Sequence, residues 1–256
     1  MTNFRQNRLR AVFRSNSIVL NSYEKKCIYP LRMLEARNIH KKFGDVEVLK
    51  GIDLIIPKAS VVSIVGASGA GKTTLLQILG TLDAADRGEL LYNDELISKL
   101  TSKQLAAFRN QHIGFIFQFH QLLPEFNALE NVCLPGMIGG KPLDQIQKRA
   151  KELLDYLGLS HRLTHKPSAL SGGEQQRVAV ARSLINSPDV IFADEPSGNL
   201  DSANADELHS LFFKLRAEFD QTFVLVTHNT MLADMADKKL VMKDGKIVNP
   251  NSLASV

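Results

Sequence analysis

Gly66-Ala-Ser-Gly-Ala-Gly-Lys-Thr73 fits the phosphate-loop pattern GxxxxGK[ST], and this stretch decides the fold class. The apolar run before it, residues 60–65, predicts a buried strand, and an amphipathic helix is expected after it to about residue 79. Glycines let the backbone wrap around phosphate groups, and a helix N-terminus adds positive potential there. Strand, loop and helix in this order predict a nucleoside triphosphate site on an α/β fold of the P-loop NTPase class.

Individual positions of the loop have separate expected roles. Lys72 is expected to meet the β- and γ-phosphates, and the Thr73 hydroxyl to bind Mg²⁺. A Gly-rich turn without a ligand is the alternative, but a chance match arises only about once in a hundred chains of this length, and the strand and helix around the loop argue against it. The other predicted nucleotide-binding positions are Gly66, Ala67, Ser68, Gly69, Ala70, Gly71 and Thr74.

Two acids follow a second apolar run, residues 190–193. Taken alone, they would indicate a solvated strand end, but the phosphate loop upstream favours a ligand site, since parallel sheets bind ligands at the carboxyl ends of their strands. Asp194 is expected to hold Mg²⁺ through water. Glu195 is expected to orient and deprotonate an attacking water molecule.

The remaining pattern alternates strands and helices, which predicts helices on both faces of a sheet. An antiparallel β edge is predicted from the strand-like runs at residues 34–40, 48–56 and 88–92. An inserted, mainly helical subdomain is predicted for residues 119–187, interrupted at Pro124, Pro135, Pro142 and Pro167. Further strands are expected at 113–117, 223–227 and 239–242, helices at 103–109, 204–219 and 231–236, and a hairpin turn at Asp244-Gly245. Together these elements predict one domain over residues 33–250.

The basic charge of the chain belongs to its first 32 residues. They carry seven basic residues and one acid, a formal charge of +6, whereas all 256 residues carry +4, so the remainder is mildly acidic at −2. That balance argues against a nucleic-acid partner. The basic segment suggests a targeting peptide, a surface-binding tail, a disordered tail or an extension upstream of a start at Met33. No apolar run reaches the roughly 18 residues of a membrane span.

Between the phosphate loop and the acids lies LSGGEQQRVAVARSL, residues 170–184, which resembles the signature of ATP-binding cassette (ABC) ATPases. The resemblance covers about residues 33–248 and implies a RecA-like core. In that family the signature contacts the ATP that a second subunit holds, so the resemblance implies a homodimer with ATP and Mg²⁺ between its subunits. The signature residues expected to face that nucleotide are Ser171, Gly172, Gly173 and Glu174.

The resemblance also assigns roles to isolated residues. Gln118 matches the Q-loop glutamine, which contacts Mg²⁺ and the attacking water, and His228 matches a histidine that contacts the γ-phosphate. Residues 197–201 resemble the D-loop, which crosses the dimer interface. Phe43 lies where the family commonly has a Tyr stacked on adenine; Phe keeps the aromatic face, and the alternative is a core Phe.

Residues 109–132, above all Phe119-His-Gln-Leu-Leu-Pro124, are similar to the ATPases of bacterial lipoprotein-releasing transporters. Residues 194–201 also suit that group and its relatives in macrolide efflux and cell division. Departures are Ala169, where many relatives have an acid, and Ser197, where Thr is commoner. The resemblance implies an ATPase on the cytoplasmic face of the inner membrane, with integral membrane subunits docking between Phe119 and Val132. The apolar residues Phe119, Leu122, Leu123, Phe126 and Leu129 would either await that partner or pack the helical subdomain.

Two readings from other classes are less well supported by the sequence. Soluble ABC ATPases that act on ribosomes or DNA usually have two cassettes or a long coiled-coil insertion, and this chain has neither. A non-hydrolysing regulatory module would lack one of the catalytic residues, but Lys72, Asp194, Glu195 and His228 are all present.

Overall fold

The computed structural model describes residues 32–248, and the residues before and after this range lie outside it. The expectations for the basic N-terminal segment therefore concern residues that are not described, apart from Arg32, which begins the first strand. Within the described range, no helix has both the length and the apolar character that crossing a bilayer requires.

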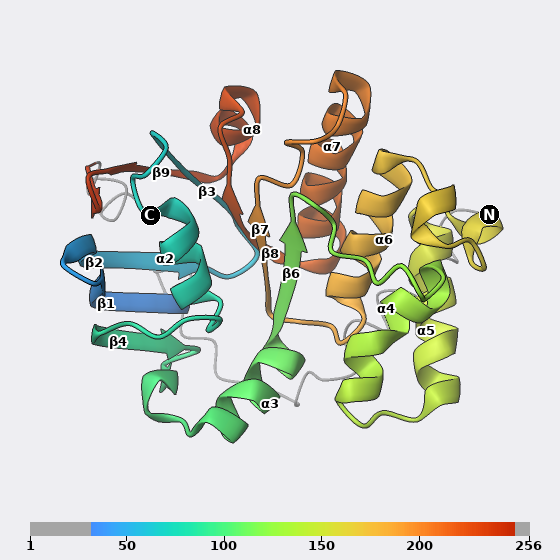
Figure 1. Ribbon diagram of the computed structural model, residues 1–256, viewed down its shortest axis with the longest axis horizontal. Helices are drawn as coiled ribbons and strands as arrows, with labels where there is room; N and C mark the ends of the chain where they lie inside the picture. Colours follow the sequence, from blue (N-terminus) through green and yellow to red (C-terminus); the bar gives the residue numbers. More distant parts are fainter. Residues whose placement is uncertain (1–31, 249–256) are drawn as a thin grey trace, which may run out of the picture.

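A six-stranded sheet forms the centre of the molecule (Figure 1). Its order is β10–β9–β3–β8–β7–β6, and the neighbours pair in parallel except β10, which runs antiparallel to β9. The bounds are Val61–Gly66 (β3), Ile113–Phe117 (β6), Val190–Asp194 (β7), Thr222–Val226 (β8), Lys238–Lys243 (β9) and Lys246–Ile247 (β10). The strands predicted from apolar runs are confirmed, and so is the hairpin turn between β9 and β10.

The central strands are buried on both faces because successive side chains of a strand point to opposite sides. Val62 and Phe192 belong to one hydrophobic cluster, while their neighbours Val61 and Ile191 belong to the other. The first cluster is completed by the helix α2 (Lys72–Leu79) and the antiparallel sheet, and the second by helices on the opposite face. This burial explains why these strands are continuous apolar runs rather than alternating ones.

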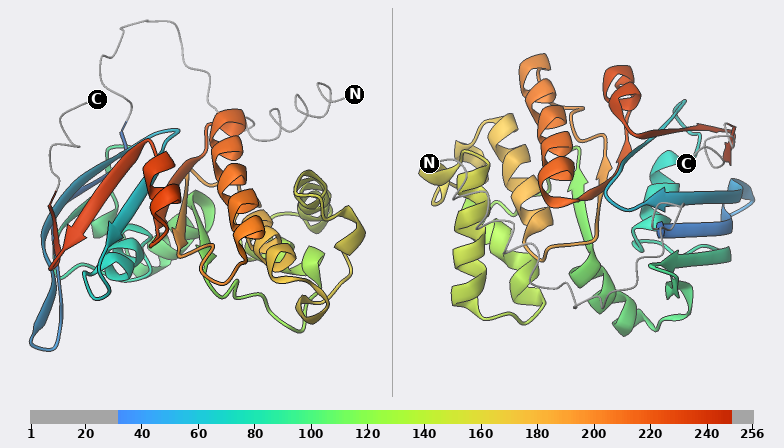
Figure 2. Two further views of the ribbon diagram at one scale, coloured as in Figure 1. Left: turned by 90° about the horizontal axis from the view of Figure 1, so that it is seen from above. Right: turned by 180° about the vertical axis from the view of Figure 1, so that it is seen from behind.

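A separate four-stranded antiparallel sheet, of order β2–β1–β4–β5, confirms the predicted β edge. Its strands are Arg32–Phe43 (β1), Val46–Pro57 (β2), Arg87–Tyr92 (β4) and Glu95–Leu96 (β5). The Lys50 backbone N–H donates to the Gly245 carbonyl oxygen at 3.0 Å and links this sheet to the end of the central one. Figure 2 shows the long β1–β2 hairpin projecting from the same side as α2.

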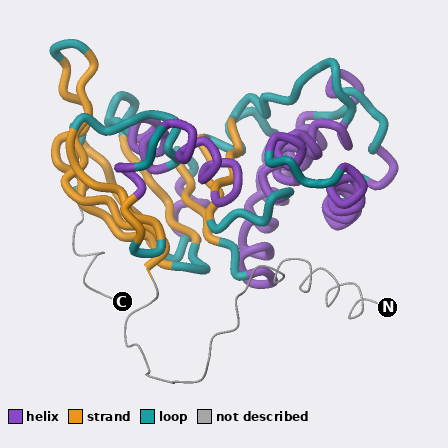
Figure 3. Tube along the Cα trace, turned by 90° about the horizontal axis from the view of Figure 1, so that it is seen from below, coloured by secondary structure: helices purple, strands orange, loops and turns teal. Residues whose placement is uncertain are grey.

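The helices divide between the two faces and a separate helical region. The α-helices are Lys72–Leu79 (α2), Ser102–His112 (α3), Ala128–Ile138 (α4), Leu143–Tyr156 (α5), Gly172–Leu184 (α6), Ser202–Phe219 (α7) and Thr230–Met235 (α8); short 3₁₀ turns are Ile97–Lys99 (η1), Ser160–Arg162 (η2) and Pro167–Ala169 (η3). Figure 3 shows α4, α5 and α6 together on the side away from the antiparallel sheet.

The inserted segment, expected to be mainly helical, contains α4, α5 and α6 and begins with an irregular stretch. Residues 118–127 are not helical, because α4 starts only after Asn127, whose side chain accepts the Glu130 N–H in a capping box. Pro135 was expected to interrupt the helical pattern, but it lies inside α4. Its carbonyl accepts hydrogen bonds from the side chains of Asn110 and Asn186, so contacts from outside the helix support this turn.

Candidate active site

The phosphate loop, residues 66–73, joins β3 to α2 at the carboxyl edge of the sheet. Gly71 caps α2 with a φ of 96°, in the left-handed region that favours glycine. A Cβ on Gly66 would run into the carbonyl oxygen of Met242, so the strand and the loop approach each other too closely for a side chain. The backbone therefore requires glycine at both positions.

Lys72 is buried inside this loop, with 7% of its surface exposed. Its Nζ donates to the carbonyl oxygens of Gly66 and Ala67, both at 3.0 Å. The ammonium group is thus held at the centre of the loop by the backbone that surrounds it. An anion entering the loop finds this positive charge already in place, next to the N-terminus of α2.

Asp194 ends β7 directly opposite the phosphate loop. The Thr73 hydroxyl donates to its Oδ1 at 3.4 Å. Burial raises the pKa of Asp194, although the Thr73 hydrogen bond and the positive charge of Lys72 act in the lowering direction. A buried carboxylate beside a hydroxyl, with a charge that is only partly compensated, is an oxygen donor set that suits Mg²⁺.

Glu195 follows in a strained backbone conformation, with a φ of 47°. Its backbone N–H donates to the Val226 carbonyl oxygen at 2.9 Å, which anchors it to β8. Its Oε2 accepts the His228 backbone N–H at 3.2 Å, and His228 Nε2 lies 3.2 Å from Oε1. That Oε1 atom is buried and accepts no hydrogen bond from the described residues. The fold therefore brings the predicted base and the predicted histidine together.

Gln118 begins the segment after β6. Phe117 pairs with Asp194 in the parallel register of β6 and β7, so Gln118 lies one residue beyond the acid. Its side chain contacts the D-loop, residues 197–201, through Asn199. The resemblance placed Asn199 in the D-loop but gave it no role of its own, because an exposed amide in a loop has no periodic signal.

The signature residues form the N-terminus of α6. Ser171 is the N-cap: its hydroxyl accepts the Glu174 N–H at 3.2 Å, and the Glu174 carboxylate accepts the Ser171 N–H at 2.8 Å. This backbone hydrogen bond from Ser171 is the main reason that the pKa of Glu174 is lowered, and Arg162 contributes further. Gln176 donates to the Pro196 carbonyl oxygen at 2.7 Å and ties the signature helix to the residue that precedes the D-loop. The capping box thus uses the N–H groups of Ser171 and Glu174, whereas those of Gly172 and Gly173 lie in the first turn, where a helix supplies no partner of its own.

The signature and the phosphate loop of one chain do not meet. α2 and α6 lie on opposite sides of β6, β7 and β8 in Figure 1 and again in the rear view of Figure 2. The structure thus brings Lys72, Thr73, Asp194 and Glu195 to one end of the sheet with His228 and Gln118, whereas Ser171–Glu174 lie elsewhere.

Phe43 ends β1 with 52% of its surface exposed, so the alternative of a core Phe is wrong. Lys41 Nζ lies 5.2 Å from the ring centroid. The hairpin also touches the phosphate loop, since a Cβ on Gly71 would lie 2.9 Å from Leu49 Cδ2. The ring is therefore exposed at the surface, on a hairpin that also contacts the phosphate loop.

The segment after Gln118 is held by side chains from two helices. Arg182 of α6 donates to the carbonyl oxygens of His120 and Gln121, at 2.7 and 2.6 Å, and both acceptors have left-handed φ values near 50°. Of the five apolar residues in question, Phe119, Leu123 and Phe126 are exposed, whereas Leu122 and Leu129 pack on the second cluster. Packing of the helical subdomain is thus confirmed for Leu122 and Leu129, and docking of a partner stays a prediction for the three exposed residues.

Asn131 organises the rest of this segment from a fully buried position in α4. Its Oδ1 accepts the Leu123 N–H at 2.8 Å, and its Nδ2 donates to the carbonyl oxygens of Leu123, Phe126 and Asn127 at 3.0 to 3.1 Å. One side chain therefore replaces the backbone hydrogen bonds that a helix would supply here.

Replacing Asn131 with Ala should lower the free energy of unfolding by about 1–3 kcal/mol, because buried backbone groups lose their partners. Chemical denaturation measures the change. Glu125→Ala in the same segment is the control: Glu125 is exposed, and its loss should change stability by less than about 0.5 kcal/mol. Equal effects of the two variants would show that Asn131 does not organise the segment.

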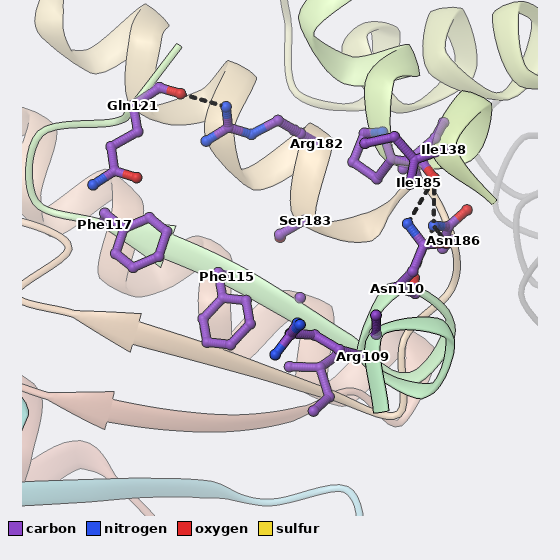
Figure 4. A pocket seen from close by; sticks show the side chains of 14 residues that line it. Arg109, Asn110, Phe115, Phe117, Gln121, Ile138, Arg182, Ser183, Ile185 and Asn186 are labelled. Carbon is purple, nitrogen blue, oxygen red and sulfur yellow. Dashed lines mark hydrogen bonds between the residues drawn. The ribbon is translucent and has the colours of Figure 1, made fainter. Parts of the chain in front are cut away.

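A cleft of about 450 Å³ lies beside this segment and away from the phosphate loop. Figure 4 shows Phe115 and Phe117 of β6 on one side and Arg182 of α6 and Ile138 of α4 on the other. The cleft is therefore formed jointly by the sheet and the helical region.

Comparison with known proteins identifies the family. A family model described as ABC transporter matches residues 49–198. The chain is 64% identical over 216 residues to the lipoprotein-releasing system ATP-binding protein LolD of Cytophaga hutchinsonii, covering 84% of this chain and 99% of that protein. It is 59% identical over 216 residues to LolD of Bacteroides fragilis, covering 84% and 100%.

Solved structures agree with this. The dimeric post-hydrolysis state of the ATP-binding cassette MJ0796, bound to ADP and Pi, superposes with a TM-score of 0.77 at 38% identity, covering 84% of this chain and 97% of that one. With a family model over more than half of its length and such relatives over most of it, the chain belongs to the ABC transporter family, as an ATP-binding and ATP-hydrolysing cassette.

Proposed function

We propose that this chain is the ATPase subunit of a complex that releases lipoproteins from the bacterial inner membrane, where it acts peripherally on the cytoplasmic face. The observation that carries the proposal is the 64% identity to a lipoprotein-releasing ATP-binding protein over 99% of that protein's length. The resemblance of residues 119–124 to the same group is the local feature that agrees with it. Related efflux and cell-division complexes are the alternatives that the experiment below separates.

ATP binds with its phosphates in the loop of residues 66–73 and with Thr74 behind it, while adenine stacks on the exposed face of Phe43. Thr73, Asp194 and Gln118 are the residues that would hold Mg²⁺. The ion, when bound, neutralises charge on the β- and γ-phosphates. Lys72 adds its positive charge at the loop centre, where it already lies.

Glu195 is the general base. Its carboxylate takes a proton from the attacking water. His228 lies 3.2 Å away and contacts the γ-phosphate, and Gln118 orients the water. Each group lies at the carboxyl end of a parallel strand, so the sheet fixes their relative positions.

The active unit is a homodimer. The Ser171–Glu174 helix start lies away from the phosphate loop of its own chain, and it completes the site of a second copy by presenting backbone N–H groups and a hydroxyl to the γ-phosphate. MJ0796, a cassette that superposes on this chain, is a dimer in its solved structure. ATP thus joins two subunits, and its hydrolysis loosens them.

Membrane subunits dock between Phe119 and Val132. Three apolar side chains are exposed in this segment, and the cleft of Figure 4 lies next to it. Because the segment begins at Gln118 and is held by Arg182 of the signature helix, closure of the dimer is transmitted to whatever occupies it.

Affinity purification from detergent-solubilised membranes, with ATP present and followed by mass spectrometry, tests the proposal. Recovery of the membrane subunits of a lipoprotein-releasing complex is the expected result, and Phe119→Asp should abolish it without weakening ATP binding. Efflux or division subunits would reassign the substrate. Ribosomal or DNA-repair partners without any membrane protein would contradict the proposal altogether.

A further inference from the structure

Asn199 of the D-loop forms hydrogen bonds to Gln118 through both the oxygen and the nitrogen of its carboxamide. Gln118 Nε2 donates to Asn199 Oδ1 at 3.2 Å, and Asn199 Nδ2 donates to the main-chain oxygen of Gln118 at 3.1 Å. The two residues are 81 positions apart in the chain. The bond to the main-chain oxygen fixes the Asn199 carboxamide, and its Oδ1 is thereby held in place to accept the hydrogen bond from the Gln118 side chain.

The contact also decides which end of the Gln118 carboxamide faces the D-loop. Asn199 Oδ1 can only accept a hydrogen bond, so it selects the NH₂ group of Gln118. None of the described residues donates to Gln118 Oε1. The oxygen, the end of the carboxamide that suits a hard cation, therefore remains free.

Gly198 supports the same orientation by leaving room for it. A Cβ at this position would lie 2.8 Å from Gln118 Nε2 and 3.2 Å from its Cδ. The backbone of Gly198 is outside the left-handed region, so an alanine is allowed conformationally and only the Gln118 side chain stands in its way. Two D-loop residues thus affect the Gln118 carboxamide: Asn199 forms a hydrogen bond to it, and Gly198 leaves room for it.

The Gln118 carboxamide is attached to a strand next to the one that carries Asp194, one of the proposed metal-binding residues. Gln118 directly follows Phe117, the register partner of Asp194, and Asp194 accepts the Thr73 hydroxyl. Asn199 itself touches neither Asp194 nor Thr73 in the described hydrogen bonds, so any influence on them passes through Gln118.

We infer that Asn199 is a positioning residue: it orients the Gln118 carboxamide so that Oε1 is presented to the Mg²⁺·ATP site, and it makes that orientation depend on the D-loop. The inference rests on the role proposed above for Gln118. A movement of the D-loop would release or restore the glutamine, which links the dimer interface to the metal site within one chain.

A double-mutant cycle of Asn199→Ala, Gln118→Ala and the double variant tests this. The first readout is the side-chain NH₂ signal of Gln118 in the ¹⁵N spectrum of the full chain without nucleotide or metal, which Asn199→Ala should shift. The second is the Mg²⁺ concentration for half-maximal ATP hydrolysis, which should rise about fivefold, the effect of one net hydrogen bond. In the Gln118→Ala background, Asn199→Ala should add nothing.

Gly198→Ala provides an independent variant, because it keeps Asn199 and displaces the same carboxamide. It should reproduce both effects, and Ser210→Ala, at an exposed position of α7, should produce neither. If Asn199→Ala changes the Mg²⁺ dependence equally with and without Gln118, the positioning role is wrong while the proposed function stands. If Gln118→Ala alone leaves the Mg²⁺ dependence and turnover intact, the role of Gln118 fails, and the inference fails with it.

Discussion

Glu195→Gln should lower the rate of ATP hydrolysis by about 10²–10⁴-fold, the usual contribution of a general base, while ATP still binds. The amide keeps the size of the carboxylate and can still accept the His228 N–H, but it cannot take a proton from water. Because ATP is bound but not cleaved, the variant should accumulate as a dimer. Phosphate release measures the first effect, and light scattering with Mg²⁺·ATP measures the second.

The geometry makes Glu195→Gln a clean test of the chemistry. The left-handed backbone at residue 195 is anchored by a hydrogen bond to Val226 and does not depend on the carboxylate, so the thermal stability without nucleotide should be unchanged. Glu207→Gln is the matched control, because Glu207 lies on the surface of α7 in an exposed ion pair with Arg177. Hydrolysis by Glu195→Gln at the wild-type rate would falsify the assignment of the base.

Much of this site follows from local sequence patterns. The phosphate loop is a contiguous motif with fixed backbone demands, seen in the φ of Gly71 and in the contact of Gly66 with Met242. The strands were predictable because their burial on both faces leaves continuous apolar runs. Asp194 and Glu195 were predictable because a strand end in a parallel sheet is a position with known geometry.

What the sequence did not reveal depends on contacts between distant residues. The irregular course of residues 118–127 was not predictable, because hydrogen bonds from Asn131 and Arg182 replace those of a helix there. Neither residue differs in the sequence from an ordinary polar helical position. Leu122 and Phe119 could not be separated for a related reason: irregular backbone has no periodicity from which to infer which side chain is buried.

Lys72→Ala is expected to weaken ATP binding by about 10²–10³-fold, since removing one member of a buried charge pair costs about 2–5 kcal/mol. Turnover at saturating ATP should fall as well, because the same ammonium group stabilises charge that develops on the γ-phosphate. The effect on binding distinguishes this variant from Glu195→Gln, which should leave affinity intact. Calorimetric titration with ATP and steady-state kinetics measure the two effects.

Lys72→Met is the control that separates charge from shape. Methionine fills much of the volume of the lysine chain but carries no charge and donates to neither Gly66 nor Ala67. If the positive charge attracts the phosphates, both variants should bind ATP equally weakly. If Lys72 holds the loop in shape through these two carbonyl oxygens as well, both variants should in addition melt at a lower temperature without nucleotide. ATP affinity that persists in Lys72→Met would show that the loop backbone and the helix N-terminus are sufficient to bind the phosphates.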